Sequence, residues 1–510
     1  MKKTNHSGNK ISPRPSFKSS KAKVSLRKYP SNSSASKILT PISPAVKIHL
    51  RPQVQNLEYV FNPRSVAIVG ASANPKKVGH SILRNFLHAC FEGKIYPINT
   101  HEEEVLGIKA YKKVSEASDS VDCVIIATPA NTVYDILRDA LKSKIKAAVV
   151  ISGGFSEVGN KKEELKIKEL ADKHQIALIG PNCMGILNPQ TRNDSIFLPI
   201  FKLGRPRVGQ TAFISQSGAV GGCIVDLAAK SSIGISKFVS YGNAACINET
   251  DLIEYFIQDA QTDSLISYIE GVNDGRRFMR AVSTISRHKP FVVLKAGKSA
   301  LGSQAALSHT GALAGSYKIF TSAVKQAGAI EVKNLNELFY IAKILQIKKF
   351  FSSRIAVLTN GGGNGVLAAD AIEHYGLKLA NFSPVTLKGL SSFLPNYAQP
   401  KNPLDIIGDA DASRYEKSLE LLIADDSIDA IVVIILFQTS TLDSRIVNVL
   451  MQAKTKSTKP IIAVSTGGDY TQLHSKMLDD YGIPTYPSPD DAMSSLSKIL
   501  RYNIYCHTHQ

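Results

Sequence analysis

Short apolar runs rich in β-branched residues alternate along the chain with longer segments in which apolar residues recur at helical spacing. Such runs are typical of buried parallel strands, and the segments between them are typical of crossover helices. The first series therefore predicts an open α/β domain. Its predicted strands are SVAIV (65–69), VDCVIIA (121–127), KAAVVIS (146–152) and IALIG (176–180), with a further strand ending in YPINT (96–100).

Two more series of the same kind follow, and the chain of 510 residues is too long for one ordinary core. Together the three series predict three doubly wound α/β domains, which we place at 58–200, 201–348 and 349–510. The second series contains TAFIS (211–215), ISKFVS (235–240), SLISYIE (264–270) and FVVLK (291–295). The third contains RIAVLTN (354–360), DAIVVIIL (429–436) and PIIAVS (460–465).

The N-terminal segment 1–57 differs from the rest, because it is rich in Ser, Lys and Pro and lacks hydrophobic periodicity, so we expect it to be disordered. It holds twelve Lys or Arg and no acidic residue, so twelve of the nineteen net positive charges lie here. The folded part then carries +7, and we expect no specific nucleic-acid partner. The segment could be a dispensable solvated extension, an organelle transit peptide, or a weak contact for nucleic acid or an anionic membrane.

The six cysteines are scattered, with no CxxC pair and no metal-ligand spacing. This pattern favours a reducing compartment such as the cytoplasm and predicts no metal site in the chain. No window supplies the ~18 uncharged apolar residues of a membrane span, so we expect none.

The first predicted strand ends at Gly70 and leads through ASANPKKV to a helix that starts near Gly79. Glycines at such a turn let the backbone approach a phosphate, and Lys76 adds positive charge to the loop. The GxGxxG spacing is absent, which disfavours a nicotinamide-dependent dehydrogenase, and a plain tight turn explains this motif equally well.

Small and turn-forming residues also follow the other predicted strands of this domain, in YPINT, ATPA (127–130), ISGGF (151–155) and GPNCMG (180–185). Ligands of open α/β sheets bind beyond the carboxyl ends of the strands, so these loops predict one shared crevice. The set resembles the CoA-binding domain of the succinyl-CoA synthetase α subunit and of the ADP-forming acyl-CoA synthetases. That resemblance implies that the adenine nucleotide part of CoA lies over these loops, with the pantetheine running toward the next domain. The implied CoA-binding residues are Gly70, Ser72, Lys76, Gly79, Asn99, Thr128, Ser152, Gly153, Gly154 and Asn182.

The second domain opens with ISQSGAVGG (214–222), a strand that runs into a Gly-flanked helix start. Ser215, Ser217 and the amide of Gly218 could hold a phosphate there, although serine N-caps are the simpler interpretation. The motif is not GxSxG, so a hydrolase is disfavoured. AGKS (296–299) is not a P-loop either, because Val292 stands where the first glycine would be.

His309 lies in the string LKAGKSALGSQAALSHTGALAG (294–315), among small residues that leave an imidazole accessible. A neutral ring nitrogen is a competent phosphoryl acceptor near pH 7, although a lone histidine is more often structural. The string resembles the phosphohistidine loop of the ADP-forming acyl-CoA synthetases, and this resemblance places the phosphorylated histidine at His309. It also implies that the acidic residue of SYIEG (267–271), Glu270, orients the histidine and stabilises its phosphorylated form.

The resemblance covers residues 58–505. It implies a Rossmann-like CoA-binding domain followed by two flavodoxin-like domains of the succinyl-CoA synthetase type. The implied function is that of an α-type subunit interconverting carboxylate, CoA and ATP with acyl-CoA, ADP and phosphate. A CoA- or acyl-CoA-sensing regulatory protein that kept the fold without catalysis is the alternative. The acid could be acetate, propionate, succinate or an aryl acid.

The nucleotide site is expected on another polypeptide. In the single-chain members of the family an ATP-grasp domain binds the nucleotide and metal, and the sequence contains no comparable segment. TNGGGNG (359–365) lacks the lysine and hydroxyl of a P-loop, so we favour a packing role for it, and Asp405 could be structural or could face the acyl site. We therefore expect ATP or ADP and Mg²⁺ to be bound by an ATP-grasp β subunit in an αβ or α₂β₂ assembly.

Overall fold

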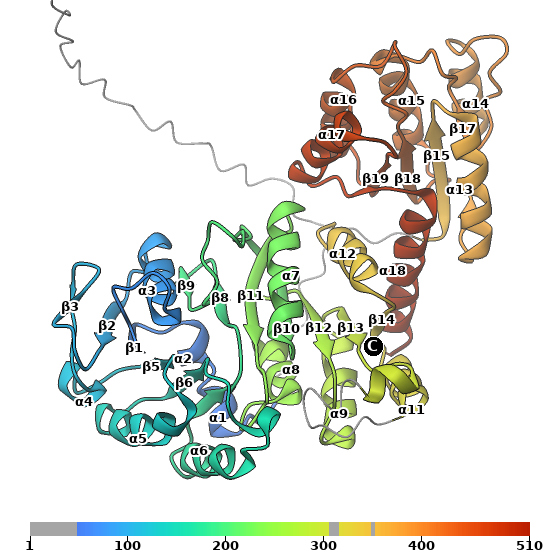
Figure 1. Ribbon diagram of the computed structural model, residues 1–510. Helices are drawn as coiled ribbons and strands as arrows, with labels where there is room; N and C mark the ends of the chain where they lie inside the picture. The colour runs from blue at the N-terminus through green and yellow to red at the C-terminus, as the bar shows by residue number, and fades with distance from the viewer. Residues whose placement is uncertain (1–47, 305–315, 348–351, 510) are drawn as a thin grey trace, which may run out of the picture. The chain divides into compact units, whose positions relative to one another are not determined.

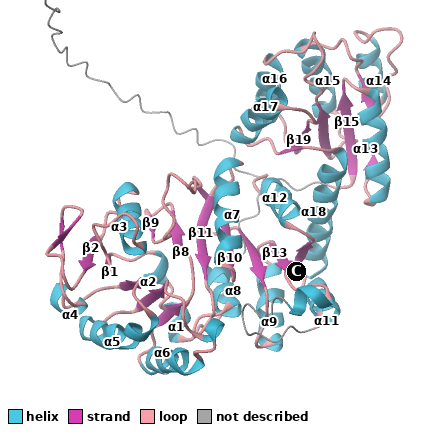
Figure 2. Cartoon of the chain, in the orientation of Figure 1, coloured by secondary structure: helices cyan, strands magenta, loops and turns pink. Residues whose placement is uncertain are grey.

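The computed structural model describes residues 48–304, 316–347 and 352–509, all of which belong to one compact unit spanning residues 42–510. Three mainly parallel sheets follow one another along the chain (Figure 1). Within each sheet the strands alternate with helices (Figure 2), as expected for a doubly wound α/β fold. The predicted fold class is therefore confirmed.

The first sheet is parallel, with the strand order β2-β1-β5-β6-β7. Its central strands are buried along their whole length, which explains their continuous apolar runs. The strands are β1 (Ser65–Val69), β2 (Lys94–Ile98), β5 (Cys123–Ile126), β6 (Ala147–Val150) and β7 (Ala177–Ile179). The connections contain α3 (Val78–His88), the hairpin β3 (Glu104–Val105) and β4 (Ile108–Lys109), α4 (Val114–Ala117), α5 (Ala130–Ala140) and α6 (Lys161–Lys173).

The second sheet has the order β14-β13-β12-β10-β11-β8-β9. Its strands are β8 (Gly185–Asn188), β9 (Asn193–Asp194), β10 (Val208–Ser215), β11 (Ile235–Ser240), β12 (Ser264–Ile269), β13 (Phe291–Lys295) and β14 (Ile330–Val332). Its helices are α7 (Gly218–Lys230), α8 (Glu249–Gln258), α9 (Gly275–Ser286), α11 (Tyr317–Gln326) and α12 (Leu335–Ile344).

The boundary between the first two domains differs from the predicted position at residue 200. Strands β8 and β9 precede that position but belong to the second sheet, where β8 pairs antiparallel with β11. The chain thus leaves the first sheet directly after β7. These strands are short and lack the β-branched run by which the other strands could be recognised.

The third sheet has the order β16-β15-β18-β19-β20, with β17 paired to β15. Alternate residues of its strands face two separate cores, so that Ile355 and Val357 pack with α13 and α18 while Ala356 and Leu358 pack with α14 to α16. The strands are β15 (Arg354–Thr359), β16 (Lys378–Leu379), β17 (Leu404–Asp405), β18 (Ala430–Ile434), β19 (Ile461–Val464) and β20 (Thr485–Tyr486). The helices are α13 (Gly362–His374), α14 (Pro384–Ser391), α15 (Ala412–Ala424), α16 (Arg445–Lys456), α17 (Asp469–Asp480) and α18 (Pro489–His509).

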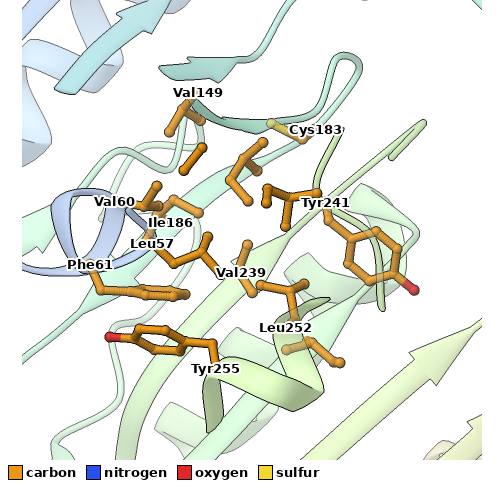
Figure 3. Close-up of a cluster of buried hydrophobic side chains, with 14 of the residues drawn as sticks. Leu57, Val60, Phe61, Val149, Cys183, Ile186, Val239, Tyr241, Leu252 and Tyr255 are labelled. Carbon is orange, nitrogen blue, oxygen red and sulfur yellow. The ribbon is translucent and has the colours of Figure 1, made fainter. Parts of the chain in front are cut away.

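The end of the predicted disordered extension is in fact folded. The short helix α1 (Pro52–Gln55) lies there and α2 (Glu58–Phe61) follows directly after it, and Val54 and Leu57 are completely buried. Figure 3 shows Leu57 and Phe61 in the same apolar cluster as Val239 of β11. The prediction of disorder up to residue 57 is therefore wrong for residues 48–57. Leu50, Val54 and Leu57 stand at helical spacing there, but the polar composition of residues 1–57 as a whole concealed them. Residues 1–47 lie outside the described part of the chain.

Candidate functional site

A pocket of about 630 Å³ lies at the carboxyl ends of strands from the first and second sheets. It is lined on one side by loops that follow β5, β6 and β7, and on the other by the start of α7 and the residue after β12. Seven residues predicted from separate motifs line this one cavity: Thr128, Ser152, Gly153, Asn182, Ser217, Gly218 and Glu270.

Apolar side chains complete the pocket wall, among them Met184, Phe197 and Leu198. Cys183 also lines it, but burial raises the pKa of this thiol to about 12. The thiol is therefore protonated near neutral pH, and Cys183 is unsuited to nucleophilic catalysis. This mixture of apolar walls and a few polar groups is typical of a pocket for a small ligand.

Gly70 and Gly79 permit close packing at the edge of this site and do not line the pocket. A Cβ at Gly79 would stand 1.9 Å from the carbonyl oxygen of Gly70, so helix α3 lies directly against the turn after β1. Gly70 has a φ of +88°, which side-chain-bearing residues rarely adopt. The turn brings the N-terminus of α3 next to the strand ends, as a phosphate-approach loop requires.

Ser72 and Asn99 are held together by a residue that sequence reasoning missed. Glu102 accepts hydrogen bonds from the Ser72 hydroxyl (3.4 Å) and from Asn99 Nδ2 (3.1 Å). Lys76, on the same loop, is exposed to solvent. All three predicted residues thus lie in loops at the carboxyl end of the first sheet, outside the lining of the pocket.

The loop after β6 is stabilised by its own carboxylate. Gly154 and Phe155 donate backbone hydrogen bonds to Glu157, at 2.5 and 3.2 Å. Asn243 donates to the same carboxylate at 2.6 Å. Burial alone would raise the pKa of Glu157, but these hydrogen bonds outweigh it and the pKa is lowered. The amide of Gly154 therefore already donates to Glu157. Ser152 and Gly153 line the pocket, and the Ser152 hydroxyl donates to the Thr128 carbonyl.

At the start of α7 the two predicted serines have different roles. Ser217 is the N-cap, and its hydroxyl oxygen accepts the amide of Val220 at 3.3 Å. Ser215 is completely buried and donates to the Ser217 carbonyl at 2.7 Å, so it stabilises the turn instead of facing the pocket. Gly218 and Ala219 line the pocket, which places the first amides of a 13-residue helix at its wall.

Glu270 follows β12 and is nearly buried, with an exposed fraction of 8%. Its position is fixed through the backbone, because the amides of Glu270 and Gly271 both donate to Oε1 of Gln216, at 2.9 and 3.2 Å. Burial and the Glu270 carboxylate together raise the pKa of the neighbouring Tyr268 to about 12. Tyr268 is therefore a neutral phenol beside this carboxylate near pH 7.

A buried ammonium group completes this end of the second sheet. Lys295, the last residue of β13, donates to the carbonyl oxygens of Glu270 (2.6 Å) and Ala296 (2.5 Å). Burial lowers the pKa of Lys295, and the carboxylate of Glu270 partly offsets this effect. Sequence reasoning missed both Lys295 and Gln216, although a lysine within the apolar run FVVLK is a recognisable signal.

His309 belongs to residues 305–315, which lie outside the described part of the chain. Its role as the phosphorylated residue stays a prediction. Strand β13, which precedes this segment, ends beside β12 and brings Lys295 to Glu270.

In the third domain a carboxylate lies at the glycine-rich turn. A Cβ at Gly362, the first residue of α13, would stand 2.6 Å from Oδ2 of Asp405. Asp405 also accepts the Ile407 amide at 2.9 Å. A carboxylate against this helix N-terminus repels a phosphate, so the geometry favours the packing interpretation of TNGGGNG.

Within the described ranges, no cluster of three or more His, Cys, Asp or Glu side chains could hold a metal ion. No helix in these same ranges combines the length and apolar character needed to cross a membrane.

Three family models match the chain in succession. A CoA binding domain matches residues 64–189, a succinyl-CoA ligase like flavodoxin domain matches 208–345, and a Ligase-CoA domain matches 355–501. These matches follow the three sheets of the structure.

The chain is also similar over most of its length to named ligases. It is 41% identical to subunit alpha of acetate–CoA ligase (ADP-forming) II from Pyrococcus furiosus, and the match covers 87% of this chain and 97% of that one. It is 38% identical to acetate–CoA ligase (ADP-forming) I from Archaeoglobus fulgidus, covering 88% of this chain but only 64% of that one.

Among solved structures, the fold is similar to that of the dinucleotide forming acetyl-coenzyme A synthetase 1 of Ca. Korarchaeum cryptofilum, in complex with phosphate and ADP. The TM-score is 0.83 at 35% identity, and the match covers 89% of this chain and 98% of that one. The three sheets of the structure stand in the same order as the three matched domains. The chain belongs to the family of ADP-forming acetate–CoA ligase α subunits.

Proposed function

We propose that this chain is the α-type subunit of an acyl-CoA synthetase that interconverts carboxylate, CoA and ATP with acyl-CoA, ADP and phosphate through phosphorylated His309. The observation that carries the proposal is the single pocket that joins the strand ends of the CoA-binding domain to Glu270 and the start of α7. A CoA-sensing regulatory protein is disfavoured, because the relatives at 37–41% identity are named as ligases.

The CoA molecule is proposed to bind with its adenine nucleotide part over the loops that contain Ser72, Asn99 and Thr128. The pantetheine then enters the pocket past Ser152 and Asn182, and its thiol reaches the second domain. The apolar wall formed by residues such as Phe197 and Leu198 suits this chain of methylene and amide groups.

In the direction of acyl-CoA synthesis, a carboxylate oxygen of the substrate attacks the phosphorus on His309, and the N–P bond breaks to leave a neutral imidazole. The CoA sulfur then attacks the acyl carbon while the thiol proton passes to an oxygen of the phosphate group, and the bond from that carbon to the phosphate oxygen breaks. Inorganic phosphate leaves. The amides of Gly218 and Ala219 at the start of α7 are suited to stabilise the phosphoryl group during both steps.

Glu270 is proposed to hold one nitrogen of the His309 ring so that the other is presented to phosphorus. Gln216 and Lys295 fix the backbone that carries this carboxylate. Lys295 also provides a positive charge near a site that must accept the negative charges of the phosphoryl group and the substrate carboxylate.

The nucleotide and its magnesium are proposed to bind to a separate ATP-grasp β subunit, in an αβ or α₂β₂ assembly. A relative of which this chain covers 97% is named a subunit alpha, whereas the chain covers only 64% of a relative whose name specifies no subunit. The carboxyl substrate is proposed to be a small acid. Relatives are named for acetate, 4-hydroxybutyrate and trans-ferulate, so the acid is best identified with a panel.

The direct test is an assay of net synthesis. The chain is co-expressed with ATP-grasp polypeptides from the same source, the complex is purified, and acyl-CoA is measured with ATP, Mg²⁺, CoA and a panel of acids. We expect acyl-CoA and ADP in equal amounts from the complex and none from the chain alone. Synthesis by the isolated chain would contradict the proposal that a separate subunit binds the nucleotide. A stable complex that binds CoA but makes no acyl-CoA would contradict the proposed ligase activity.

A further inference from the structure

The side chain of Glu102 occupies hydrogen-bond donors of the first CoA-binding loop. Its carboxylate accepts the backbone amide of Ala73 at 3.2 Å, in addition to the Ser72 hydroxyl and Asn99 Nδ2. A backbone amide, a hydroxyl and a side-chain amide that converge on one point are a typical arrangement for binding an anion. Here the anion is part of the protein.

The turn that carries Glu102 is built in a way that directs this carboxylate to the loop. Oδ1 of Asn99 accepts the amides of His101 (2.8 Å) and Glu102 (3.0 Å). Nδ2 of Asn99 also donates to the Ala71 carbonyl at 2.8 Å, which joins the turn to the loop. The backbone position of Glu102 is therefore fixed next to the first loop, within reach of its donors.

The carboxylate is nevertheless held weakly. Its hydrogen bonds of 3.1–3.4 Å are at the long end of the usual range. No Lys, Arg or His pairs with it among the residues that the structure describes. Lys76, on the loop itself, is exposed. A phosphate group brings more charge and more acceptor oxygens than a carboxylate, so it would form stronger hydrogen bonds with the same donors.

We propose that Glu102 competes with a phosphate group of CoA for the donors at Ser72, Ala73 and Asn99, and that it thereby sets the affinity for CoA. This inference rests on the proposed CoA site. When CoA binds, the carboxylate must leave these donors, and the cost of that displacement weakens binding. Glu102 is thus an affinity-determining residue and not a ligand of CoA.

The test is a calorimetric titration of the full chain with CoA, which requires neither turnover nor a partner. We expect Glu102→Gln to bind CoA about threefold to tenfold more tightly than the wild type, which corresponds to one hydrogen-bonded group. The matched control is Glu103→Gln, which removes the same charge one residue away. Glu103 is exposed, and its backbone carbonyl accepts the Ala110 amide at 2.8 Å. We expect this control to change the dissociation constant by less than about twofold.

A second variant and a second ligand sharpen the result. Glu102→Ala removes the acceptor atoms entirely, and we expect it to bind CoA at least as tightly as Glu102→Gln. Dephospho-CoA, which lacks the 3′-phosphate, shows which phosphate of CoA competes with Glu102. If the Glu102 variants also bind dephospho-CoA more tightly than the wild type does, the competing group is the diphosphate. If they bind it with the wild-type affinity, the competing group is the 3′-phosphate. Equal or weaker CoA binding by both Glu102 variants would overturn the inference while leaving the CoA site intact. No CoA binding by any protein, including the wild type, would overturn the proposed site and this inference with it.

Discussion

Glu270 is positioned by its neighbours in the sheet. Gln216 directly follows β10, and Lys295 ends β13, so the backbone of Glu270 is fixed from both adjacent strands. Such fixation lets a carboxylate orient a second group without a loss of side-chain freedom at each turnover.

Replacement of this carboxylate tests its role. We expect Glu270→Gln to lower the rate of phosphoryl transfer about 10²-fold or more, because the charge opposite the ring is lost while the shape is kept. The rate is measured as incorporation of label from inorganic phosphate into the protein in the presence of acyl-CoA, and the melting temperature is recorded alongside. An unchanged rate would show that Glu270 is an ordinary strand-end carboxylate.

Glu249, at the start of α8, is a second nearly buried carboxyl group, and burial raises its pKa to about 7. The nearby carboxylate of Asp251 also raises the pKa of Glu249, and the buried side chain of Tyr241 lies close to Glu249. Because its pKa is higher in the folded than in the unfolded chain, the folded state binds more protons between about pH 4.5 and 7. Its contribution to stability is therefore present below this window and is lost as the pH rises through it.

We expect the wild type to lose about 2–3 kcal/mol of stability relative to Glu249→Gln when the pH is raised from 5 to 8, since each pKa unit corresponds to 1.36 kcal/mol. Urea denaturation of both proteins at the two pH values measures this difference. A difference that does not depend on pH would show that Glu249 does not titrate in this window.

At the scale of elements, the segment before β1 is part of the fold. The side chain of Arg51 contacts both carboxylate oxygens of Asp251, at 2.9 and 2.6 Å, and Asp251 is completely buried. Asp251 also takes part in the capping box of α8. Residues 50–57 therefore link the chain before the first sheet to a helix of the second.

Two truncated chains distinguish the contribution of this segment to stability from that of the residues before it. A chain that starts at residue 58 loses Leu50, Val54 and Leu57 from the core, and we expect a loss of at least about 4 kcal/mol of stability. A chain that starts at residue 48 should keep the wild-type denaturation midpoint, as the prediction of a disordered extension requires. Equal midpoints for both truncations would contradict the structural role of this segment.

The long buried strands could be predicted because a strand covered on both faces must be apolar throughout. The hairpin β8–β9 and strands β16, β17 and β20 could not, since each is only two to four residues long. The end of the extension was assigned wrongly because the composition of residues 1–57 as a whole concealed three buried side chains.

At the scale of the whole molecule, the sequence identified the loops that meet at the pocket but not the contacts within them. Thr128, Ser152, Asn182 and Glu270 follow recognisable strands, so the rule for ligands at strand ends was sufficient. Lys295 and Glu102 were missed because their contacts depend on the directions of side chains that the motifs do not specify. Gln216 was missed because its contact with Glu270 depends on the order of the strands in the sheet. That order places β10 between β11 and β12 and is not encoded by the order of the motifs along the chain.

The central claim is that His309 carries a phosphoryl group between the two half-reactions. The most direct measurement is to incubate the purified complex with acyl-CoA and labelled phosphate, to digest it at alkaline pH, and to map the label by mass spectrometry. We expect an acid-labile, alkali-stable label on the peptide that contains His309, absent from His309→Ala and strongly reduced in Glu270→Gln. A label that persists in His309→Ala, or net acyl-CoA synthesis by that variant at the wild-type rate, would contradict the proposed mechanism.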